Sequence, residues 1–367
     1  MKITNRLAVA TILFVSVALA STTLTWLAAE RVRSDTFASK KRLLLSELES
    51  RRLRVVNYLE QVTNDLRIMA GSRFVQHALI DFAKAFNNTG GNAEKTLQRL
   101  YIEENPNPVG RKHLLIMARD GSSYSALHQE YHDWTSSIAK VRDYYDIFLV
   151  DPQGNIVYTV FKEDDFATNL FNGKYKDTEL AQVFSDVAAR PQTGEIYARD
   201  FVRYAPSQNK PASFFGTAVN YEGEFVGAIV VQLKPEPFNR IMHFSRSMGE
   251  SGKTYIVGKD KLLRTRSRFS EEDAVLRTKV DTKSSNAALE GRNGIWIIND
   301  YRGVPVLSAY APIQGERTTW AVLAEIDVDE VTSESDDLIL MMVLVSVIAS
   351  TLAFLLGWLL AGRDEES

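Results

Sequence analysis

Two short stretches of the chain combine residue types and spacings that can support metal or phosphate chemistry. In HQEYH, His128 and His132 are one helical turn apart and could share a metal ion. Metalloprotease motifs place the catalytic glutamate directly beside a histidine, whereas Glu130 is two residues away from both. In SMGESGKTY (247–255), Ser247 stands where a phosphate-binding loop has its first glycine, and a predicted strand follows instead of a helix. We therefore expect a solvated helix face at the histidines, and neither a metal site nor a nucleotide site.

Catalytic groups have no supporting pattern either. Asp164 and Asp165 are adjacent and would point to opposite sides of a strand, which does not suit paired-carboxylate catalysis. Serine, histidine and aspartate do not occur in a local hydrolase signature, and the chain has no cysteine to act as a nucleophile or a thiolate ligand. The sequence predicts a protein that is not an enzyme and that holds no cofactor.

Hydrogen-bonding side chains gather instead in and around the stretch DDFATNLFNGKYKDTEL (164–180). Polar groups that converge beside an aromatic-lined sheet can hold a small polar ligand. The alternative is that Asp165 and Asn169 cap local turns and that the tyrosines are half-buried strand residues. The candidate ligand-binding residues are Tyr158, Lys162, Asp165, Thr168, Asn169, Tyr175 and Tyr204.

Composition is that of a folded protein without a basic surface. The chain has 367 residues, of which 45% are hydrophobic and 24% charged, and this is enough for two domains of ordinary size. The formal net charge of -3 gives no field that would attract nucleic acid, so nucleic acid is not an expected partner. A chain without cysteine tolerates an oxidising compartment but does not identify one.

Both ends of the chain carry an apolar segment long enough to cross a membrane. Residues 7–29 and 338–362 contain no charged side chain, and a helix needs about 20 residues to cross about 30 Å of hydrocarbon. The alternative for the first segment is a cleaved signal peptide, because VALA (17–20) offers small residues at a possible cleavage site.

The residues that flank these segments predict their orientation. Lys2 and Arg6 precede the first segment, whereas the acidic stretch DVDEVTSESDD (327–337) precedes the second. Positive charge favours the cytoplasmic side of a membrane. We therefore expect cytoplasmic tails at 1–6 and 363–367, with the body of the protein outside the cell membrane.

A long stalk helix is predicted over residues 30–86. Neither proline nor glycine occurs between residues 30 and 70, and a helix of about 50 residues would be about 75 Å long, more than a compact domain covers. Its membrane-near part therefore predicts a homodimer through the stalk helix, and the alternative is that the apolar stripe faces the chain's own domain. The stripe has spacings of four and three and consists of Val55, Leu59, Val62, Leu66 and Met69.

The rest of the chain reads as one α+β unit used twice. DIFLVDPQGNIVYTV (146–160) and KTYIVGKDKLLRTRS (253–267) each have the pattern of a β-hairpin, and each precedes a helix or loop and a run of three strands. Aligning the two halves places residues 228–233 on residues 322–327 as the closing strand. We predict two five-stranded antiparallel sheets, the first in a unit spanning 87–245 and the second in a unit spanning 246–336.

These features carry a resemblance to a known family. The plan of the chain and the strings YYDIFLVDPQGNIVYTVFKEDDFATNL (144–170), YAPSQNKPASF (204–214), GKTYIVGKDKLLRTRSRF (252–269) and VLSAYAP (306–312) resemble double Cache sensor domains of bacterial chemoreceptors, histidine kinases and nucleotide cyclases. The resemblance implies two PAS-like sheets in tandem outside the inner membrane. It also implies that the membrane-distal unit binds a small molecule between its sheet and the insertion after the first hairpin, and that the proximal unit relays the change to the second transmembrane helix.

One motif of the family is absent. Members that recognise amino acids carry Arg-x-Trp-Tyr in this insertion, whereas the equivalent stretch 164–180 has neither arginine nor tryptophan. Amino-acid binding is therefore not carried over to this chain. The resemblance places the ligand in the same region, beside the seven candidate residues named above.

The output of such a sensor is not in the sequence. In the family the second transmembrane helix continues into a HAMP linker and an output domain, whereas five residues follow residue 362 here. The expectation is either a truncated receptor, which we favour, or a complete input subunit that acts on another membrane protein. A competing function is a membrane-anchored interaction subunit whose outer domain binds a protein, and an exposed apolar patch in place of an enclosed polar pocket would favour it.

Overall fold

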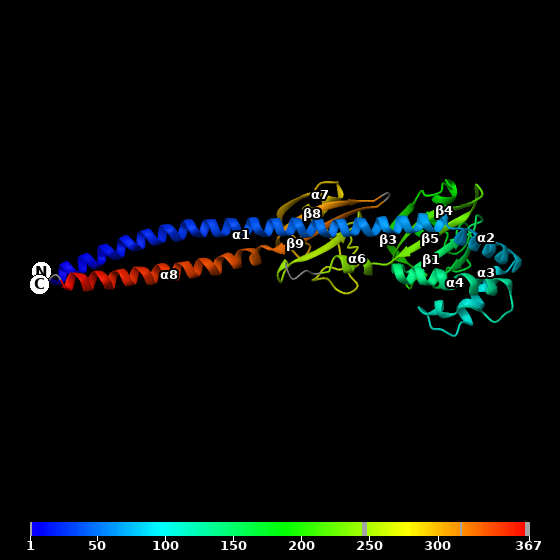
Figure 1. Cartoon of the computed structure of the whole chain (residues 1–367), viewed down its shortest axis with the longest axis horizontal. Helices are drawn as coiled ribbons and strands as arrows, with labels where there is room; N and C mark the ends of the chain where they lie inside the picture. The colour runs from blue at the N-terminus through cyan, green and yellow to red at the C-terminus, as the bar shows by residue number, and fades with distance from the viewer. Residues whose placement is uncertain (1, 244–247, 316–317, 364–367) are drawn as a thin grey trace.

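The computed structural model describes residues 2–243, 248–315 and 318–363 as an elongated molecule. Two long helices run side by side from the end that holds both termini, and two β-sheet units follow one another along the first helix (Figure 1). The α+β class with a long N-terminal helix and two sheets is confirmed. The predicted tail 363–367 lies outside the described residues except for the backbone of its first residue, and the predicted boundary between the units, at 245 and 246, lies outside them as well.

The first helix, α1 (Lys2–Gly71), turns its apolar stripe toward the chain's own sheets. After α1 ends, a second helix, α2 (Arg73–Asn88), begins at Ser72, which has an extended backbone and whose hydroxyl accepts a hydrogen bond from the Phe74 amide at 3.2 Å. The predicted stalk helix 30–86 is therefore two helices. The buried stripe, which is not free to pair with a second copy, consists of Leu44, Leu48, Val55, Leu59, Val62, Leu66 and Met69.

The distal unit contains a sheet of five antiparallel strands in the order β2-β1-β5-β4-β3. Successive residues of a strand point to opposite faces. Phe148 and Val150 of β1 therefore pack with α5, whereas Ile147 and Leu149 belong to the core shared with α1 and α2. The strands are β1 (Asp146–Val150), β2 (Ile156–Thr159), β3 (Tyr197–Tyr204), β4 (Lys210–Tyr221) and β5 (Glu224–Leu233), and the other helices are α3 (Ala93–Gln98), η1 (Arg99–Glu103), η2 (Lys112–Leu114), α4 (Ser123–Arg142) and α5 (Glu179–Ala189).

The proximal unit contains a sheet of four described strands in the order β6-β9-β8-β7, so the prediction of five strands is wrong here. The expected second strand of its hairpin makes only isolated bridges, because the Thr265 hydroxyl, and not a backbone carbonyl, accepts the Ile256 amide at 2.9 Å. The elements of this unit are α6 (Glu236–Ile241), β6 (Lys253–Val257), α7 (Lys283–Leu289), β7 (Gly294–Asn299), β8 (Pro305–Gln314) and β9 (Thr319–Asp327).

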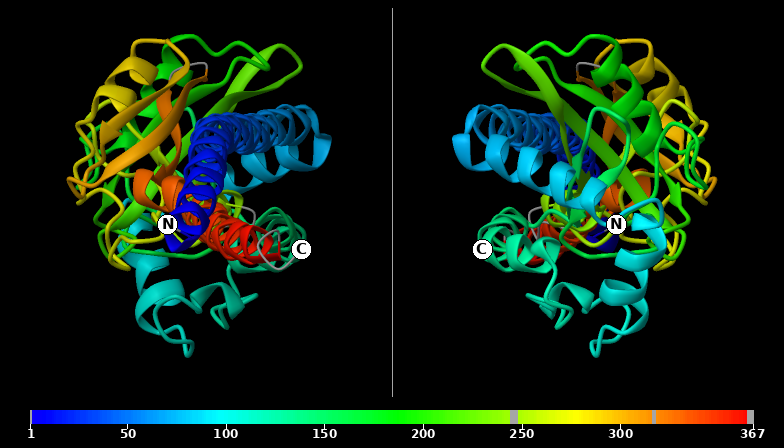
Figure 2. Two further views of the ribbon diagram at one scale, coloured as in Figure 1. Left: turned by 90° about the vertical axis from the view of Figure 1, so that its left-hand side faces the viewer. Right: turned by 90° about the vertical axis from the view of Figure 1, so that its right-hand side faces the viewer.

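The last helix, α8 (Val328–Arg363), continues directly from β9 and lies against α1, as the view along the molecule shows (Figure 2). Thr25 and Ser346 share a hydrogen bond of 2.7 Å across the helix pair, and the rings of Phe14 and Phe354 meet edge to face. Both helices are long and apolar enough to cross a membrane by length and composition. They contain the segments 7–29 and 338–362 that the sequence predicts as spans.

Candidate ligand-binding site

The insertion between β2 and α5, residues 160–178, lies at one end of the distal sheet and carries most of the predicted site. The structure divides the seven predicted residues into two buried groups and two separate positions. Asp165, Thr168 and Tyr204 form one group, and Tyr158 and Lys162 form the other with a histidine of α4. The two separate positions are Asn169 and Tyr175.

The first group is built around a buried carboxyl group. The Tyr204 hydroxyl, at the end of β3, donates a hydrogen bond of 2.6 Å to Asp165 Oδ2, and the Thr168 hydroxyl donates one of 2.7 Å to the Asp165 carbonyl. Asp165 is 1% exposed, and its Oδ1 has no hydrogen-bond partner among the described residues. Burial raises the pKa of Asp165 well above its ordinary value, and the nearby charges of Asp146 and Glu163 act in the same direction.

Glu163 adds a second buried carboxyl group that the sequence interpretation missed. Its Oε1 accepts from the Tyr145 hydroxyl at 2.6 Å and its Oε2 from the Ser207 hydroxyl at 2.5 Å. Gln232 of β5 donates to Ser207 at 2.9 Å, and its own Oε1 is buried with no described partner. Burial raises the pKa of Glu163, although its two hydrogen bonds oppose the shift.

Asp146, at the start of β1, is a third buried carboxyl group, and its oxygens are fully engaged. Oδ2 accepts from the Thr159 hydroxyl at 2.7 Å, and Oδ1 accepts from the Val160 amide at 2.8 Å. Burial raises the pKa of Asp146. Together, Asp146, Glu163, Asp165 and Gln232 are called the distal polar cluster below. The sequence signal that could have pointed to it is an acidic residue at the head of the apolar strand IFLV.

The second group surrounds a buried lysine. Lys162 Nζ donates to the carbonyls of Val160 at 2.9 Å and Thr159 at 3.1 Å and lies 3.4 Å from His132 Nδ1. Tyr158 donates its hydroxyl to the same His132 nitrogen at 2.7 Å. Burial lowers the pKa of Lys162, because the desolvated ammonium is less stable than the neutral amine.

The histidines of α4 are buried, and the prediction of a solvated helix face is wrong. The rings of His128 and His132 stack at 4.5 Å, and His132 Nε2 donates to the His113 carbonyl at 2.6 Å. Burial and the charge of Lys162 lower the pKa of His132 to about 3, which keeps its ring neutral. Among the described residues, no group of three or more histidine, aspartate or glutamate side chains is arranged to hold a metal ion.

Asn169 and Tyr175 lie apart from both groups. The Asn169 side-chain amide donates to the Gln153 carbonyl at 2.9 Å, and its oxygen accepts from the Phe171 amide at 2.9 Å, so it closes a local turn. Tyr175 is buried beneath the ammonium of Lys174, 5.0 Å from its ring centre. Neither side chain makes a described hydrogen bond to the distal polar cluster.

Two cavities border the buried groups. One of about 670 Å³ lies between the units, where Tyr145, Phe161 and Gln232 face Arg266 and Glu272 of the proximal unit. The other, of about 550 Å³, is lined by His113, His132 and Phe161 among others. The rings of Tyr145 and Phe161 are stacked with their centres 5.1 Å apart. Of the distal polar cluster, Gln232 lines the first cavity, whereas Asp146, Glu163 and Asp165 line neither of the two.

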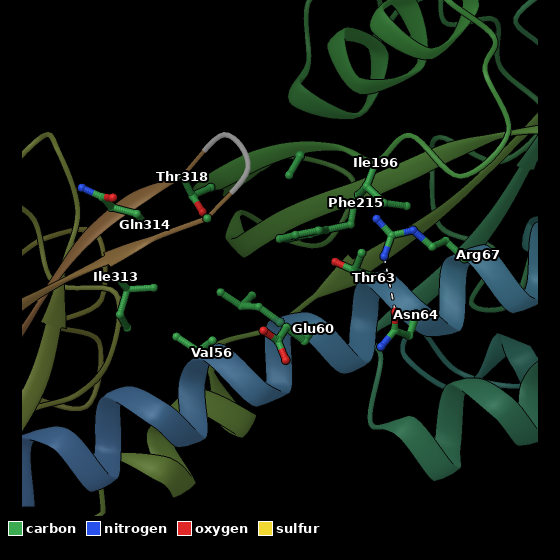
Figure 3. A pocket seen from close by; sticks show the side chains of 13 residues that line it. Val56, Glu60, Thr63, Asn64, Arg67, Ile196, Phe215, Ile313, Gln314 and Thr318 are labelled. Carbon is green, nitrogen blue, oxygen red and sulfur yellow. Dashed lines mark hydrogen bonds between the residues drawn. The ribbon is translucent and has the colours of Figure 1, made fainter.

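A third cavity, of about 390 Å³, lies where α1 passes both sheets (Figure 3). Glu60 and Arg67 approach it from α1, Phe215 from the distal sheet, and Gln314 and Thr318 from the proximal sheet. Arg67 is held by the Asn64 side chain at 3.3 Å. None of the seven predicted residues lines this cavity, which belongs to the junction of the units.

The two units are joined by a charged contact on β3. Asp200 accepts two hydrogen bonds from Arg264, at 3.0 and 2.8 Å, and a third from the Trp320 indole at 2.8 Å. The pairing of β3 with β4 is irregular between Arg199 and Val202, and such a bulge redirects side chains. Asp200 therefore connects the distal strand β3 to the proximal strand β9 through its hydrogen bond with Trp320.

The proximal unit has its own buried charges at the corresponding end of its sheet. Lys253 Nζ lies 2.8 Å from Asp300 Oδ2 and 3.3 Å from Glu325 Oε2, and the side chains of all three are fully buried. Arg302 pairs with Asp300 at 2.7 Å and with Asp327 at 2.6 Å. Lys253 belongs to the stretch 247–255, whose Ser247 lies outside the described residues. Its ammonium is within ion-pair distance of these carboxylates but makes no described hydrogen bond.

Comparison with known proteins identifies the family. No curated protein matches the chain. Similar solved structures include a Pseudomonas aeruginosa amino acid chemoreceptor domain, PctC, in complex with GABA (15% identity, 66% of this chain and 97% of that chain, TM-score 0.38). Another is the Campylobacter jejuni chemoreceptor Tlp3 sensory domain with isoleucine bound (9% identity, 82% of this chain and 98% of that chain, TM-score 0.44). A third is a domain of a putative sensory box/GGDEF family protein from Vibrio parahaemolyticus (11% identity, 81% of this chain and 99% of that chain, TM-score 0.48). The profile of the Cache domain family matches residues 53–335, so the chain belongs to this family, as its resemblance predicted.

Proposed function

We propose that the chain is a membrane-anchored sensor whose distal unit binds a small molecule outside the cell membrane. The observation that carries the proposal is the distal polar cluster, in which Asp165 Oδ1 and Gln232 Oε1 are buried without described partners. A buried acceptor left unpaired costs about 1–3 kcal/mol. A ligand that forms hydrogen bonds with these atoms removes that cost, and the cavity lined by Gln232 has room for such a ligand.

The helix pair supports the membrane-anchored part of the proposal. The apolar segments 7–29 of α1 and 338–362 of α8 lie side by side, and both termini are at the same end of the molecule (Figure 1). The flanking charges favour a cytoplasmic location for these termini. The sheet units then project outward from the membrane, with the distal unit farthest away.

Strand β3 offers a route from the distal polar cluster to the membrane. Tyr204, at its end, holds Asp165, and Asp200, four residues earlier, is held by Trp320 of β9. β9 continues into α8 without an intervening loop. A small displacement of β3 on ligand binding would shift β9 and α8 against α1, which is the type of helix shift that membrane receptors transmit.

An interaction subunit is the second candidate function, and one surface favours it. A groove of about 590 Å³ between the end of α1 and α4 exposes Ile68, Trp134 and Val141, of which Ile68 is 70% and Val141 78% exposed. Exposed apolar patches commonly mark protein contacts. The homodimer through the stalk helix stays a prediction. Because the apolar stripe of α1 is buried against the chain's own sheets, a dimer interface would use the opposite face of α1, near the exposed residues Leu53 and Ile68.

Thermal unfolding of the full chain in lipid nanodiscs, against an array of small metabolites, tests the sensor proposal. A ligand at 100 times its dissociation constant stabilises the folded state by about 2.7 kcal/mol, which raises the unfolding midpoint by several degrees. The variant Asn169→Ala alters a turn of the insertion and leaves the distal polar cluster intact. As a control, it should show the same ligand-induced rise of the unfolding midpoint as the unaltered chain. If no compound in the array shifts the midpoint, the sensor proposal fails and recovery of membrane protein partners tests the second candidate.

A further inference from the structure

The outer strands of the two sheets differ in how their free edges are covered. The strand orders place β2 and β3 at the edges of the distal sheet, and β6 and β7 at the edges of the proximal sheet. An edge strand presents unpaired backbone N–H and C=O groups on which another chain can add a strand. Natural proteins cover such edges, bend them with bulges or place charges on them. What each edge carries therefore indicates whether it is available for pairing.

Three of the edges have one of these protections. Along β2, the Ile156 amide donates a hydrogen bond of 2.9 Å to the Thr168 carbonyl of the insertion. Along β6, the Ile256 carbonyl accepts one of 2.8 Å from the Arg264 amide. Strand β3 carries charged side chains, and its pairing with β4 is irregular next to Asp200. These strands are therefore poor templates for a further strand.

The edge strand β7, with the sequence GIWIIN (294–299), has none of these protections. It contains no charged residue and no proline, and it pairs with β8 residue for residue without a bulge. Beyond this pairing, the backbone of residues 294–299 makes no described hydrogen bond, and the Ile297 side chain is 56% exposed. A regular, apolar and uncovered edge strand is a template for strand addition.

Positive side chains surround the start of β7. A depression of about 620 Å³ beside it is lined by Lys41 of α1, Arg292 and Trp296 among others, and no carboxylate is among its described lining residues. Lys283 of α7 adds a third cation, with its Nζ 4.4 Å from the centre of the Trp296 ring. Arg292 is paired with Glu290, which leaves the charge at this end of the strand positive. Acidic side chains on an added strand would complement this charge.

The packing of α1 argues against a second copy of the chain as the added strand. Leu44 and Leu48 of α1 share a core with Leu307 and Ala309 of β8, so α1 lies parallel to the plane of the proximal sheet. A two-fold axis that pairs two β7 strands antiparallel is perpendicular to this plane and reverses the direction of α1. The apolar segments 7–29 of the two copies would then point in opposite directions. Two copies anchored in one membrane therefore cannot pair in this way.

We propose that β7 is a docking site for an extended segment of a different protein, which adds a strand to the proximal sheet on the edge opposite β6. The segment is apolar or uncharged along the strand and acidic where it passes Lys41 and Arg292. Main-chain hydrogen bonds supply most of its affinity, and the charges supply its selectivity. The proposal rests on the membrane anchoring proposed above and does not depend on ligand binding by the distal unit.

Labelled peptides test the proposal on the unaltered full chain, held singly in nanodiscs. The probe has three valine–threonine repeats between pairs of aspartates, because both central residues favour strands. One control has lysines in place of the aspartates, and the other has a proline in the centre, which prevents regular pairing. Fluorescence anisotropy measures affinity, and hydrogen exchange measures protection of the backbone amides of residues 294–299. We expect the aspartate probe to bind at least ten times more tightly than either control and to slow this exchange.

The other outcomes each contradict part of the proposal. Absence of binding by the aspartate probe, or equal binding of the proline peptide, overturns strand addition at β7. Equal binding of the lysine peptide overturns the acidic character of the segment. Slow exchange at residues 294–299 without peptide, found only in nanodiscs that hold two chains, would assign the edge to a second copy. The sensor function is tested separately by the metabolite array.

A pair of variants locates the binding. Ile297→Glu places a charge on the exposed edge and repels the aspartates, so we expect it to weaken binding of the aspartate probe at least tenfold. Val141→Glu makes the same change at a residue of α4 that is 78% exposed, and it should leave the affinity unchanged. Ile297→Thr keeps a β-branched side chain and should bind like the unaltered chain. Equal affinity of Ile297→Glu and the unaltered chain would overturn the assigned site.

Discussion

The proximal unit surrounds Lys253 and Arg302 with Asp300, Glu325 and Asp327, whereas the distal unit buries three carboxyl groups around hydroxyl and amide partners. Taking charges out of water is costly unless they are paired and hydrogen-bonded. In the proximal network the charges are paired within the chain, although Lys253 Nζ makes no described hydrogen bond, and we therefore assign the network a structural role. The distal polar cluster meets this condition incompletely, because Asp165 Oδ1 and Gln232 Oε1 have no described hydrogen-bond partners. A ligand can form the missing hydrogen bonds.

The largest expected effect is the loss of the proximal ammonium. Lys253→Ala leaves Asp300 and Glu325 buried without it, and breaking a buried ion pair by removing one partner costs about 3–5 kcal/mol. We expect the urea unfolding midpoint of the full chain in detergent to fall accordingly. Lys259→Ala, at an exposed position two residues beyond β6, is the control and should change the free energy of unfolding by less than about 0.5 kcal/mol. Similar effects of the two substitutions would remove the structural role assigned to the proximal network.

The second effect is a pH dependence of stability that arises in the distal unit. Burial raises the pKa of Asp165 in the folded chain above its ordinary value of 3.8, so the folded state keeps a proton that the unfolded chain releases. The free energy of unfolding should therefore fall as pH rises from this value to the raised pKa of Asp165, and this contribution then levels off.

The slope is at most about 1.4 kcal/mol per pH unit for each proton that only the folded state keeps. Asp146 and Glu163 act in the same direction, because burial raises their pKa as well, whereas the lowered pKa of Lys162 acts in the opposite direction at higher pH. Tyr204 stays protonated, since burial raises its pKa. Urea unfolding of the full chain over a pH series measures the slope, which should be smaller in Asp165→Asn. A free energy of unfolding that rises as pH rises through this range would contradict the raised pKa of Asp165.

A third, smaller effect concerns the contact that joins the two units. Arg264 donates two hydrogen bonds to Asp200 of the distal unit, and it also lies 2.9 Å from Asp260 of its own unit. A double-mutant cycle with Asp200→Asn and Arg264→Leu should give a coupling free energy of about 1 kcal/mol, as residues in direct contact do. Urea unfolding of the full chain measures it. A second cycle, with Asp260→Asn and Arg264→Leu, measures the coupling within the proximal unit for comparison. A coupling free energy near zero between Asp200 and Arg264 would contradict the role of this contact in joining the two units.

Much of the fold was predictable because it depends on local patterns. Strand alternation and turn residues identified the distal hairpin and the first strand of the proximal one. The alignment of residues 228–233 with 322–327 identified the two closing strands but is one residue out of register, because Gln232 pairs with Asp146 and Glu325 pairs with Lys253. The missed features depend on tertiary contacts. The Thr265 hydroxyl interrupts the expected fifth strand of the proximal sheet, and the break at Ser72 rests on one side-chain cap in an otherwise helical pattern.

The candidate site was predicted in part for the same reason. Asp165 and Tyr204 were both named from the sequence and are joined by a hydrogen bond across 39 residues. Glu163 and Gln232 were missed, because an acidic or amide residue on a predicted surface gives no local sign that the fold will bury it. The histidines of α4 were placed on the wrong side of their helix, since its buried face also carries the polar residues Ser125 and Thr135.

The smallest expected effect is on the stability of the distal unit without ligand. Asp165→Asn keeps the acceptor for Tyr204 and removes a group whose ionised form is disfavoured by burial, so the free energy of unfolding at neutral pH should change by less than about 1 kcal/mol. Urea unfolding of the ligand-free full chain measures the change beside that of Lys253→Ala. A loss as large as that of Lys253→Ala would mean that Asp165 is part of a structural network like the proximal one. A small change would separate the two units by role, because the proximal network would then be needed for the fold and the Asp165 carboxyl group would not.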